Sequence, residues 1–185
     1  VRDFVIARSF GAGLMTDALR QGRSLFSFGA GHSFILTEEL VYRTGGLMLV
    51  NPIHPHGMNI FVRPLTLTSA IERVPDLGRV LLDGSPAREG DVLLIASTSG
   101  RNPVVVDMAL RAREKGIRRV GITSRAYSAG VASRHPSGMK LADLRQAGWL
   151  IDERRRLPEQ GEAALRRAQV EAVLAAERRV AEEAA

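Results

Sequence analysis

The chain has 185 residues, a formal net charge of +6 and no cysteine, so a disulfide framework, thiol catalysis and cysteine-ligated zinc are excluded. Its 45% apolar and 25% charged residues are typical of a folded globular domain and exclude a disordered chain. The positive charge is almost entirely arginine, spread along the chain without interleaved aromatic residues. We therefore expect no nucleic-acid partner, although a small phosphate-bearing ligand is compatible with this charge.

Short apolar segments alternate with stretches of helical spacing along the first 125 residues. The segments that predict buried strands span residues 24–28, 91–96 and 118–123. Helices are predicted at residues 34–44 and 103–115, and the second of these ends at Gly116. Strands that are apolar throughout and alternate with helices predict an α/β fold, a three-layer sandwich whose parallel sheet carries helices on both faces.

The segments between these elements are less regular. Residues 51–66 contain three prolines and are expected to form a loop or an irregular crossover. Residues 67–83 have a helical pattern that is interrupted at Pro75. Residues 124–140 are too polar and rich in glycine for a regular element, and a loop of that length in a compact domain is more often functional than idle.

Two of the strands run directly into loops rich in glycine and hydroxyl side chains. The first loop is "GAGHS" at residues 29–33, and the second is "STSGRN" at residues 97–102. The carboxyl edge of a parallel sheet is where such folds bind ligands, and unpaired amides at a helix start favour phosphate. Glycine lets the backbone approach an anion closely, and serine or threonine adds hydrogen bonds without charge. Both loops could therefore bind one phosphate, although each alone is also compatible with plain turn chemistry.

Three better-known phosphate or nucleophile motifs are absent. No GxxxxGK run followed by serine or threonine exists, so nucleoside triphosphatase chemistry is not expected. The dinucleotide pattern GxGxxG fails at Phe34, and the nucleophile pattern GxSxG would need glycine at Ile35. The ligand class is thus left open by the loops themselves.

Longer stretches around both loops carry a family resemblance. "FGAGHSFILTEELVYRTGGLMLVNPI" and "STSGRNPVVVDMALRAREKGIRRVGITSRAYSAGVASRHPSG" resemble a SIS (sugar isomerase) domain, from about residue 15 to 140. The chain is most similar to bacterial sugar isomerase-like proteins, and more distantly to phosphoheptose isomerase and N-acetylmuramic acid 6-phosphate etherase. The resemblance implies a five-stranded parallel sheet, a homodimer or higher homo-oligomer, and a phosphorylated sugar bound by hydroxyls of both loops.

The resemblance also implies which residues contact this ligand. By motif position they are Gly31, Ser33, Ser97, Thr98, Ser99 and Asn102, the last at the start of the following helix. Isomerase or etherase-type lyase chemistry needs an acid and a base, and His32, Glu38 and Glu39 lie in or just after the first loop. In the relatives the glutamate lies further along, at the place of Arg43 here.

Other interpretations of these residues stay open. Glu38 and Glu39 could form a solvated helix face or interact with the helix dipole, and the protein could be a non-catalytic phosphosugar sensor. His54 and His56 resemble a metal-binding pair, but Pro55 separates them and a third ligand is missing, so we predict no metal and no cofactor. His135 could face the same sheet edge or serve as a structural cap.

Two segments of the chain differ in character. Residues 1–144 are expected to form the phosphosugar-binding domain. Residues 145–185 are expected to supply the last strand and a C-terminal helix at 161–184, whose alanine-, glutamate- and arginine-rich composition is atypical of the family. The mismatch motivates the hypothesis of a truncated or frame-shifted reading frame, which the encoding DNA would test.

The sequence also bears on location. No apolar run approaches the roughly 20 residues that span a bilayer, and the first residues lack the apolar region and cleavage site of a signal peptide. We therefore expect no membrane association and a cytoplasmic protein.

Overall fold

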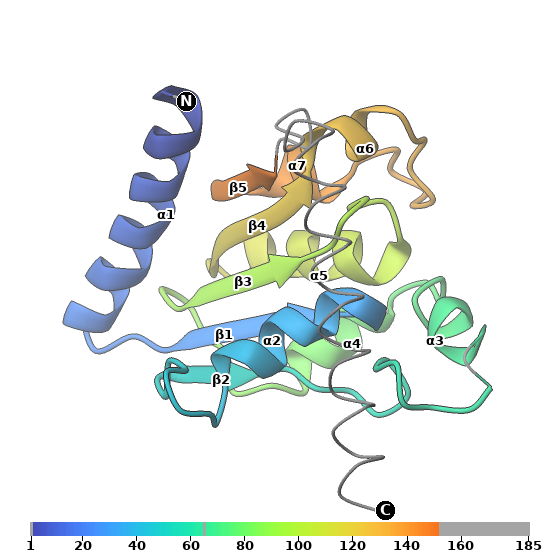
Figure 1. The fold of residues 1–185 in the computed structure, drawn as a ribbon, viewed down its shortest axis with the longest axis horizontal. Helices are drawn as coiled ribbons and strands as arrows, with labels where there is room; N and C mark the ends of the chain where they lie inside the picture. Colours follow the sequence, from blue (N-terminus) through green and yellow to red (C-terminus); the bar gives the residue numbers. More distant parts are fainter. Residues whose placement is uncertain (1, 65, 152–185) are drawn as a thin grey trace, which may run out of the picture. The chain divides into compact units, whose positions relative to one another are not determined.

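Five parallel strands form one sheet in the order β2, β1, β3, β4, β5 (Figure 1). The computed structural model describes residues 2–64 and 66–151. The strands are β1 (Leu25–Gly29), β2 (Val50–Pro52), β3 (Val92–Ala96), β4 (Arg118–Ser124) and β5 (Ala147–Ile151). The α/β class and the parallel five-stranded sheet expected from the sequence are therefore confirmed.

Helices lie on both faces of this sheet. They are α1 (Arg2–Arg20), η1 (Gly31–Ser33), α2 (Phe34–Leu40), α3 (Thr66–Ile71), α4 (Leu77–Asp83), α5 (Pro103–Glu114), α6 (Arg125–Ala129) and α7 (Leu141–Leu144). In Figure 1, α2 lies in front of the sheet, and α4 and α5 lie behind it. Among the described residues, none of these helices is both long enough and apolar enough to cross a membrane.

Two apolar cores result from the alternation of side chains along the strands. Residues such as Phe26, Leu93 and Ile95 pack with α4 and α5 on one face. Their neighbours Leu25 and Leu94 pack with α1 and α2 on the other face. Successive side chains of a strand point to opposite faces, so a strand that is buried on both sides is mostly apolar.

Several expected elements differ in extent from the observed ones. The helix expected at 34–44 ends at Leu40, because Tyr42 takes a positive φ of 49°. The segment 51–66 was expected to be irregular, but its first two residues belong to the short edge strand β2. The loop at 124–140 contains α6, which begins where Ser124 Oγ accepts a hydrogen bond from the Tyr127 amide at 3.1 Å. These three predictions were wrong in detail.

The remaining elements follow the predictions closely. The interruption at Pro75 separates α3 from α4, and α5 ends just before Gly116. No element was predicted from the sequence where α1 lies. The C-terminal helix expected at 161–184 lies outside the described residues.

Candidate functional site

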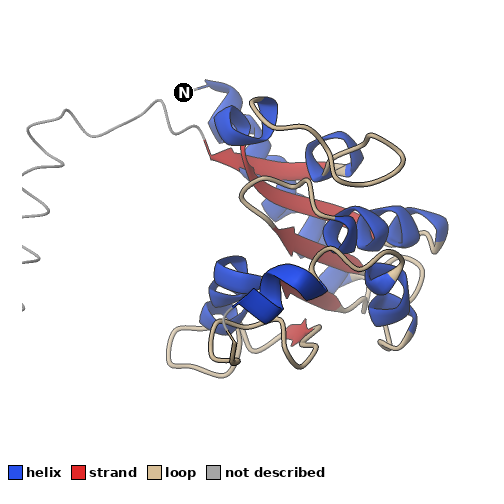
Figure 2. Cartoon of the chain, turned by 90° about the vertical axis from the view of Figure 1, so that its right-hand side faces the viewer, coloured by secondary structure: helices blue, strands red, loops and turns tan. Residues whose placement is uncertain are grey.

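The two glycine- and serine-rich loops start side by side at the same edge of the sheet. Strands β1 and β3 are parallel neighbours, and Gly29 at the end of β1 pairs with Ala96 at the end of β3. The first loop continues from Ala30 into η1, and the second runs from Ser97 to the start of α5. Figure 2 views the molecule from the side on which these and other connecting loops gather. Both strand exits therefore open onto one edge.

The first loop turns sharply at Gly31. This residue has a φ of +58°, which L side chains rarely adopt, and its amide donates to the Met58 carbonyl at 2.8 Å. A Cβ at Gly31 would lie 3.0 Å from Oε1 of Glu72. Behind the loop, a buried hydrogen bond of 2.9 Å between Ser27 Oγ and Thr37 Oγ1 fixes α2 to β1. The turn is thus rigidly placed, and glycine leaves room there for a carboxylate.

The second loop is held by hydrogen bonds at both of its ends. Ser97 Oγ accepts from the Gly100 amide at 3.1 Å, which closes a tight turn. The Thr98 carbonyl accepts from Thr123 Oγ1 and from the Ser124 amide, both at 3.0 Å. Ser99 lies at the tip of this turn and is partly exposed. The loop therefore presents hydroxyl groups on a backbone anchored to β4.

Glu72, just after α3, joins the two loops. Its carboxylate lies beside Gly31 of the first loop and accepts a short hydrogen bond from Nδ2 of Asn102 in the second. Its backbone carbonyl accepts from the Val104 amide in the first turn of α5 at 3.3 Å. Asn102, predicted as a ligand contact, is therefore the point at which the second loop meets this carboxylate.

The electrostatic environment of Glu72 is mixed. Burial raises the pKa of its carboxyl above the usual value, and this effect exceeds the lowering by the Asn102 hydrogen bond and by the charges of Arg73 and Arg134. A half-buried carboxyl with a raised pKa, placed between two polar loops, has the properties of a general base or acid.

The polar segment 130–140 packs against the second loop. Its Arg134 amide donates to the Arg101 carbonyl at 2.9 Å, and His135 Nε2 lies 2.9 Å from Oδ1 of the buried Asp107 on α5. His135 Nδ1 also accepts from the Ser137 amide at 3.1 Å, which leaves Nε2 as the protonated nitrogen. His135 thus anchors the segment to α5.

The three predicted catalytic residues lie at the surface near the first loop. His32 is exposed in η1, and Glu38 is exposed on α2. Glu39 forms an ion pair with Arg43. Their roles stay predictions. Sequence reasoning missed Glu72, because a charged residue in a helical stretch is typical of a solvated surface, and only the path of the chain from β2 to α4 brings it to the loops.

The histidine pair after β2 lies on the same edge. The His54 ring packs edge-on against Phe34, with 4.3 Å between ring centroids, and 6.3 Å separates it from the His56 ring. Within the described ranges, no group of three or more histidine, aspartate or glutamate side chains could hold a metal ion.

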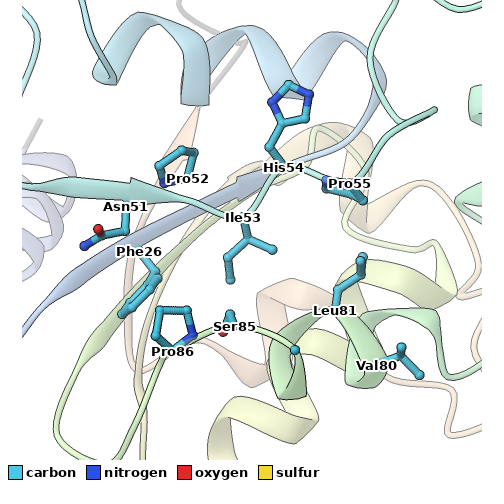
Figure 3. A pocket seen from close by; sticks show the side chains of 11 residues that line it. Phe26, Asn51, Pro52, Ile53, His54, Pro55, Val80, Leu81, Ser85 and Pro86 are labelled. Atoms are coloured by element: carbon cyan, nitrogen blue, oxygen red, sulfur yellow. The ribbon is translucent and has the colours of Figure 1, made fainter.

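A separate pocket of about 470 Å³ lies between β2 and α4 (Figure 3). Ile53 and Phe26 point toward it, whereas the His54 ring points away. Its wall is mostly apolar and contains no residue of either loop. This pocket is therefore distinct from the site at the sheet edge.

The fold and the two loops define a class of protein, and comparison with known proteins identifies it. A family model described as a SIS domain matches residues 10–124. The chain belongs to the SIS domain family, which confirms the resemblance inferred from the sequence.

Related proteins agree with this assignment. The chain is 46% identical over 133 residues to a UPF0309 protein of Shouchella clausii, covering 72% of this chain and 54% of that protein. It is 49% identical over 131 residues to a UPF0309 protein of Streptomyces coelicolor, covering 70% and 52%. The chain thus spans about half the length of the curated relatives it matches.

Solved structures share the fold. A phosphoheptose isomerase of Neisseria gonorrhoeae superposes with a TM-score of 0.54 at 20% identity, covering 88% of this chain and 82% of that one. A phosphoheptose isomerase of Francisella tularensis gives the same TM-score at 13% identity, covering 80% and 73%. At these identities the similarity concerns the fold alone. The homodimer or higher oligomer expected for this chain stays a prediction.

Proposed function

We propose that this chain binds a phosphorylated sugar at the edge where the two loops meet. The phosphate would accept hydrogen bonds from the hydroxyls of Ser33, Ser97, Thr98 and Ser99, with Gly31 allowing close approach of the backbone. Membership of the SIS domain family and the fold shared with phosphoheptose isomerases support a sugar phosphate as the ligand class. Neither cofactor nor metal is part of the proposal.

We further propose that the bound sugar undergoes proton transfer beside its carbonyl, as in an isomerase or a lyase. The observation that carries this proposal is Glu72, whose carboxylate contacts both loops at once. Its raised pKa brings it toward the range in which a carboxylate exchanges protons efficiently at neutral pH.

The proposed step uses only groups of this chain and of the sugar. A Glu72 oxygen accepts the proton from the carbon next to the carbonyl, and the electron pair moves to the carbonyl oxygen. His32, exposed in the first loop, would donate a hydrogen bond to that oxygen. For an isomerase, the hydroxyl proton of the deprotonated carbon passes to the former carbonyl oxygen, and Glu72 returns its proton to the former carbonyl carbon. For a lyase, the electron pair returns from the oxygen to re-form the carbonyl, a carbon–carbon double bond forms, and the substituent on the next carbon leaves with the proton held by Glu72.

Glu38 and Glu39 are the alternative bases. Both follow the first loop on α2, but Glu39 is engaged with Arg43 and Glu38 is exposed to solvent. Glu72 lies between the two loops and contacts both, so Glu72 is the better candidate.

Deuterium exchange tests this proposal without knowledge of the product. Hexose and heptose 6-phosphates are incubated with the protein in D₂O, and loss of the proton next to the carbonyl is followed by NMR. Binding of the same sugars is followed by thermal stabilisation. We expect the Glu72→Gln variant to bind these sugars as well as the unmodified chain does. Its exchange rate should be lower by a factor of about 100 or more.

Glu38→Gln and Glu39→Gln provide matched controls, since each removes one carboxylate near the same loop. We expect both to exchange at nearly the unmodified rate. Full exchange in Glu72→Gln, with loss in one of the other two, would move the base to α2. Binding without exchange in the unmodified chain would favour the phosphosugar sensor.

A further inference from the structure

Three arginines lie next to Glu72 or Asn102, the two residues joined by the hydrogen bond between the loops. Arg73 directly follows Glu72, Arg101 belongs to the second loop, and Arg134 comes from the segment 130–140. Arg134 Nη1 donates to Asn102 Oδ1 at 2.9 Å, so its guanidinium is fixed at the site. Three segments far apart in the sequence thus bring positive charge to one place.

These three positive charges exceed the single negative charge of the nearby Glu72 carboxylate. In the part of the chain that the structure describes, no ion pair within 4.0 Å involves any of the three; the pairs found are elsewhere. The pKa of Arg134 is lowered by burial and by the positive charges of Arg101 and Arg73. Like charges held together repel each other, and a bound anion removes that repulsion.

The arrangement is built into the fold. The Arg134 amide is bonded to the Arg101 carbonyl, and the next residue, His135, is anchored to the buried Asp107. The backbone around Arg134 is therefore fixed to α5 and the second loop, and its exposed side chain is directed to Asn102 by the bond to Oδ1.

We propose that Arg73, Arg101 and Arg134 form a second anion subsite, and that the ligand is a phosphosugar which also carries a carboxylate. This proposal rests on the proposed function. The hydroxyls and amides of the two loops suit the tetrahedral phosphate, whereas the planar fork of a guanidinium matches the two oxygens of a carboxylate. Because the arginines flank Glu72, the carboxylate belongs to the reacting end of the sugar.

Two open-chain ligands test this assignment directly. Gluconate 6-phosphate and glucitol 6-phosphate share the carbon chain and the phosphate, and differ only in a carboxylate or an alcohol at the far end. Their dissociation constants for the whole 185-residue chain are measured by calorimetry at one low salt concentration. We expect the carboxylate ligand to bind about tenfold more tightly.

Substitutions then locate the preference. We expect Arg134→Gln and Arg101→Gln each to weaken gluconate 6-phosphate about tenfold and to leave glucitol 6-phosphate nearly unchanged. Arg134→Lys keeps the positive charge but lacks the planar guanidinium. It should therefore recover part of the preference for gluconate 6-phosphate over glucitol 6-phosphate. Arg88→Gln is the matched control, because exposed Arg88 precedes β3 at the opposite edge of the sheet, and neither ligand should be affected.

Three results would overturn the subsite. Equal affinity of the two ligands for the unmodified chain would mean that no carboxylate is recognised. Equal weakening of both ligands in Arg134→Gln would place the arginines on the phosphate, and the proposed function would still stand. Failure of both ligands and of all hexose and heptose 6-phosphates to bind would instead refute the proposed function, and the subsite with it.

Discussion

The two ends of α5 carry arginines in opposite circumstances. At the C-terminal end, Arg79 and Arg111 are bonded to Glu114, and Arg111 is also bonded to Asp83. These contacts lower the pKa of Glu114 to about 2. Each charge there has a partner within the fold, so the cluster links α4 to α5 and needs no ligand.

At the N-terminal end, the arginines share one carboxyl whose pKa is raised rather than lowered. Arg134 donates to Asn102, and burial raises the pKa of Glu72 despite the nearby positive charges. Ion pairs that satisfy each other indicate structure, whereas a perturbed carboxyl among unpaired arginines indicates a site that is completed by a ligand.

The largest effect is expected where α4 packs directly on α5. A Cβ at Gly78 would lie 2.0 Å from the Val104 carbonyl oxygen and 2.6 Å from the Met108 amide nitrogen. Gly78→Ala must therefore push the helices apart, which costs about 1–3 kcal/mol or more of unfolding free energy. Urea denaturation measures this loss.

Gly84→Ala is the control for that substitution. The new Cβ would contact the Val80 carbonyl oxygen at an ordinary 3.4 Å, so a much smaller change in the urea midpoint is expected. Equal destabilisation by both substitutions would show that close packing of α4 on α5 is not the cause.

The second prediction is that substitution of Arg134 changes ligand binding, whereas substitution of Arg111 changes thermal stability. Arg134→Gln is expected to weaken gluconate 6-phosphate about tenfold with little change in melting temperature, because its charge serves the ligand. Arg111→Gln is expected to lower the melting temperature slightly and to leave binding unchanged, because its partners are Asp83 and Glu114. Calorimetry and thermal unfolding of both variants check this, and an exchange of the two outcomes would reverse the assignment.

The smallest effect is a pair of opposite pH dependences. Glu114 has a depressed pKa in the folded state, so its contribution is present above about pH 4.5 and is lost as the pH falls toward 2. Glu72 has a raised pKa, so its ionisation reduces stability as the pH rises above about 4.5. Glu114→Gln should remove the loss of stability at low pH, and Glu72→Gln should remove the loss of stability at higher pH.

Unfolding curves at several pH values, compared between each variant and the unmodified chain, measure this difference. Shifts of the same sign for the two variants would contradict the contrast between the two ends of α5.

The sequence predicts the central part of the fold because its strands are buried on both faces. β3 is a continuous apolar run, β1 is interrupted only by Ser27, β4 has the apolar centre 120–122, and α5 ends shortly before Gly116. The edge strand β2 contains Asn51 and Pro52, so its sequence resembles a loop. The helix α6 consists of only five residues and depends on the Ser124 cap, which is too local a signal to find in a polar segment.

The sequence predicts only those residues of the candidate site that lie in the loops directly after a predicted strand. The loop residues Ser33 and Ser97 follow buried strands, so pattern and position agree. Glu72 and Arg134 reach the site through the three-dimensional path of their segments, and their sequence neighbours give no sign of it. Asn102 could be singled out at the start of α5, but its bonds to those two residues required the structure.

The convergence of the two loops on one phosphate is tested most directly by NMR. A hexose 6-phosphate is titrated into the ¹⁵N-labelled chain, and the backbone amides are followed. We predict that the amides of residues 31–33 and 97–102 shift together with a single dissociation constant. Shifts confined to one loop, or located away from both, would contradict a shared site.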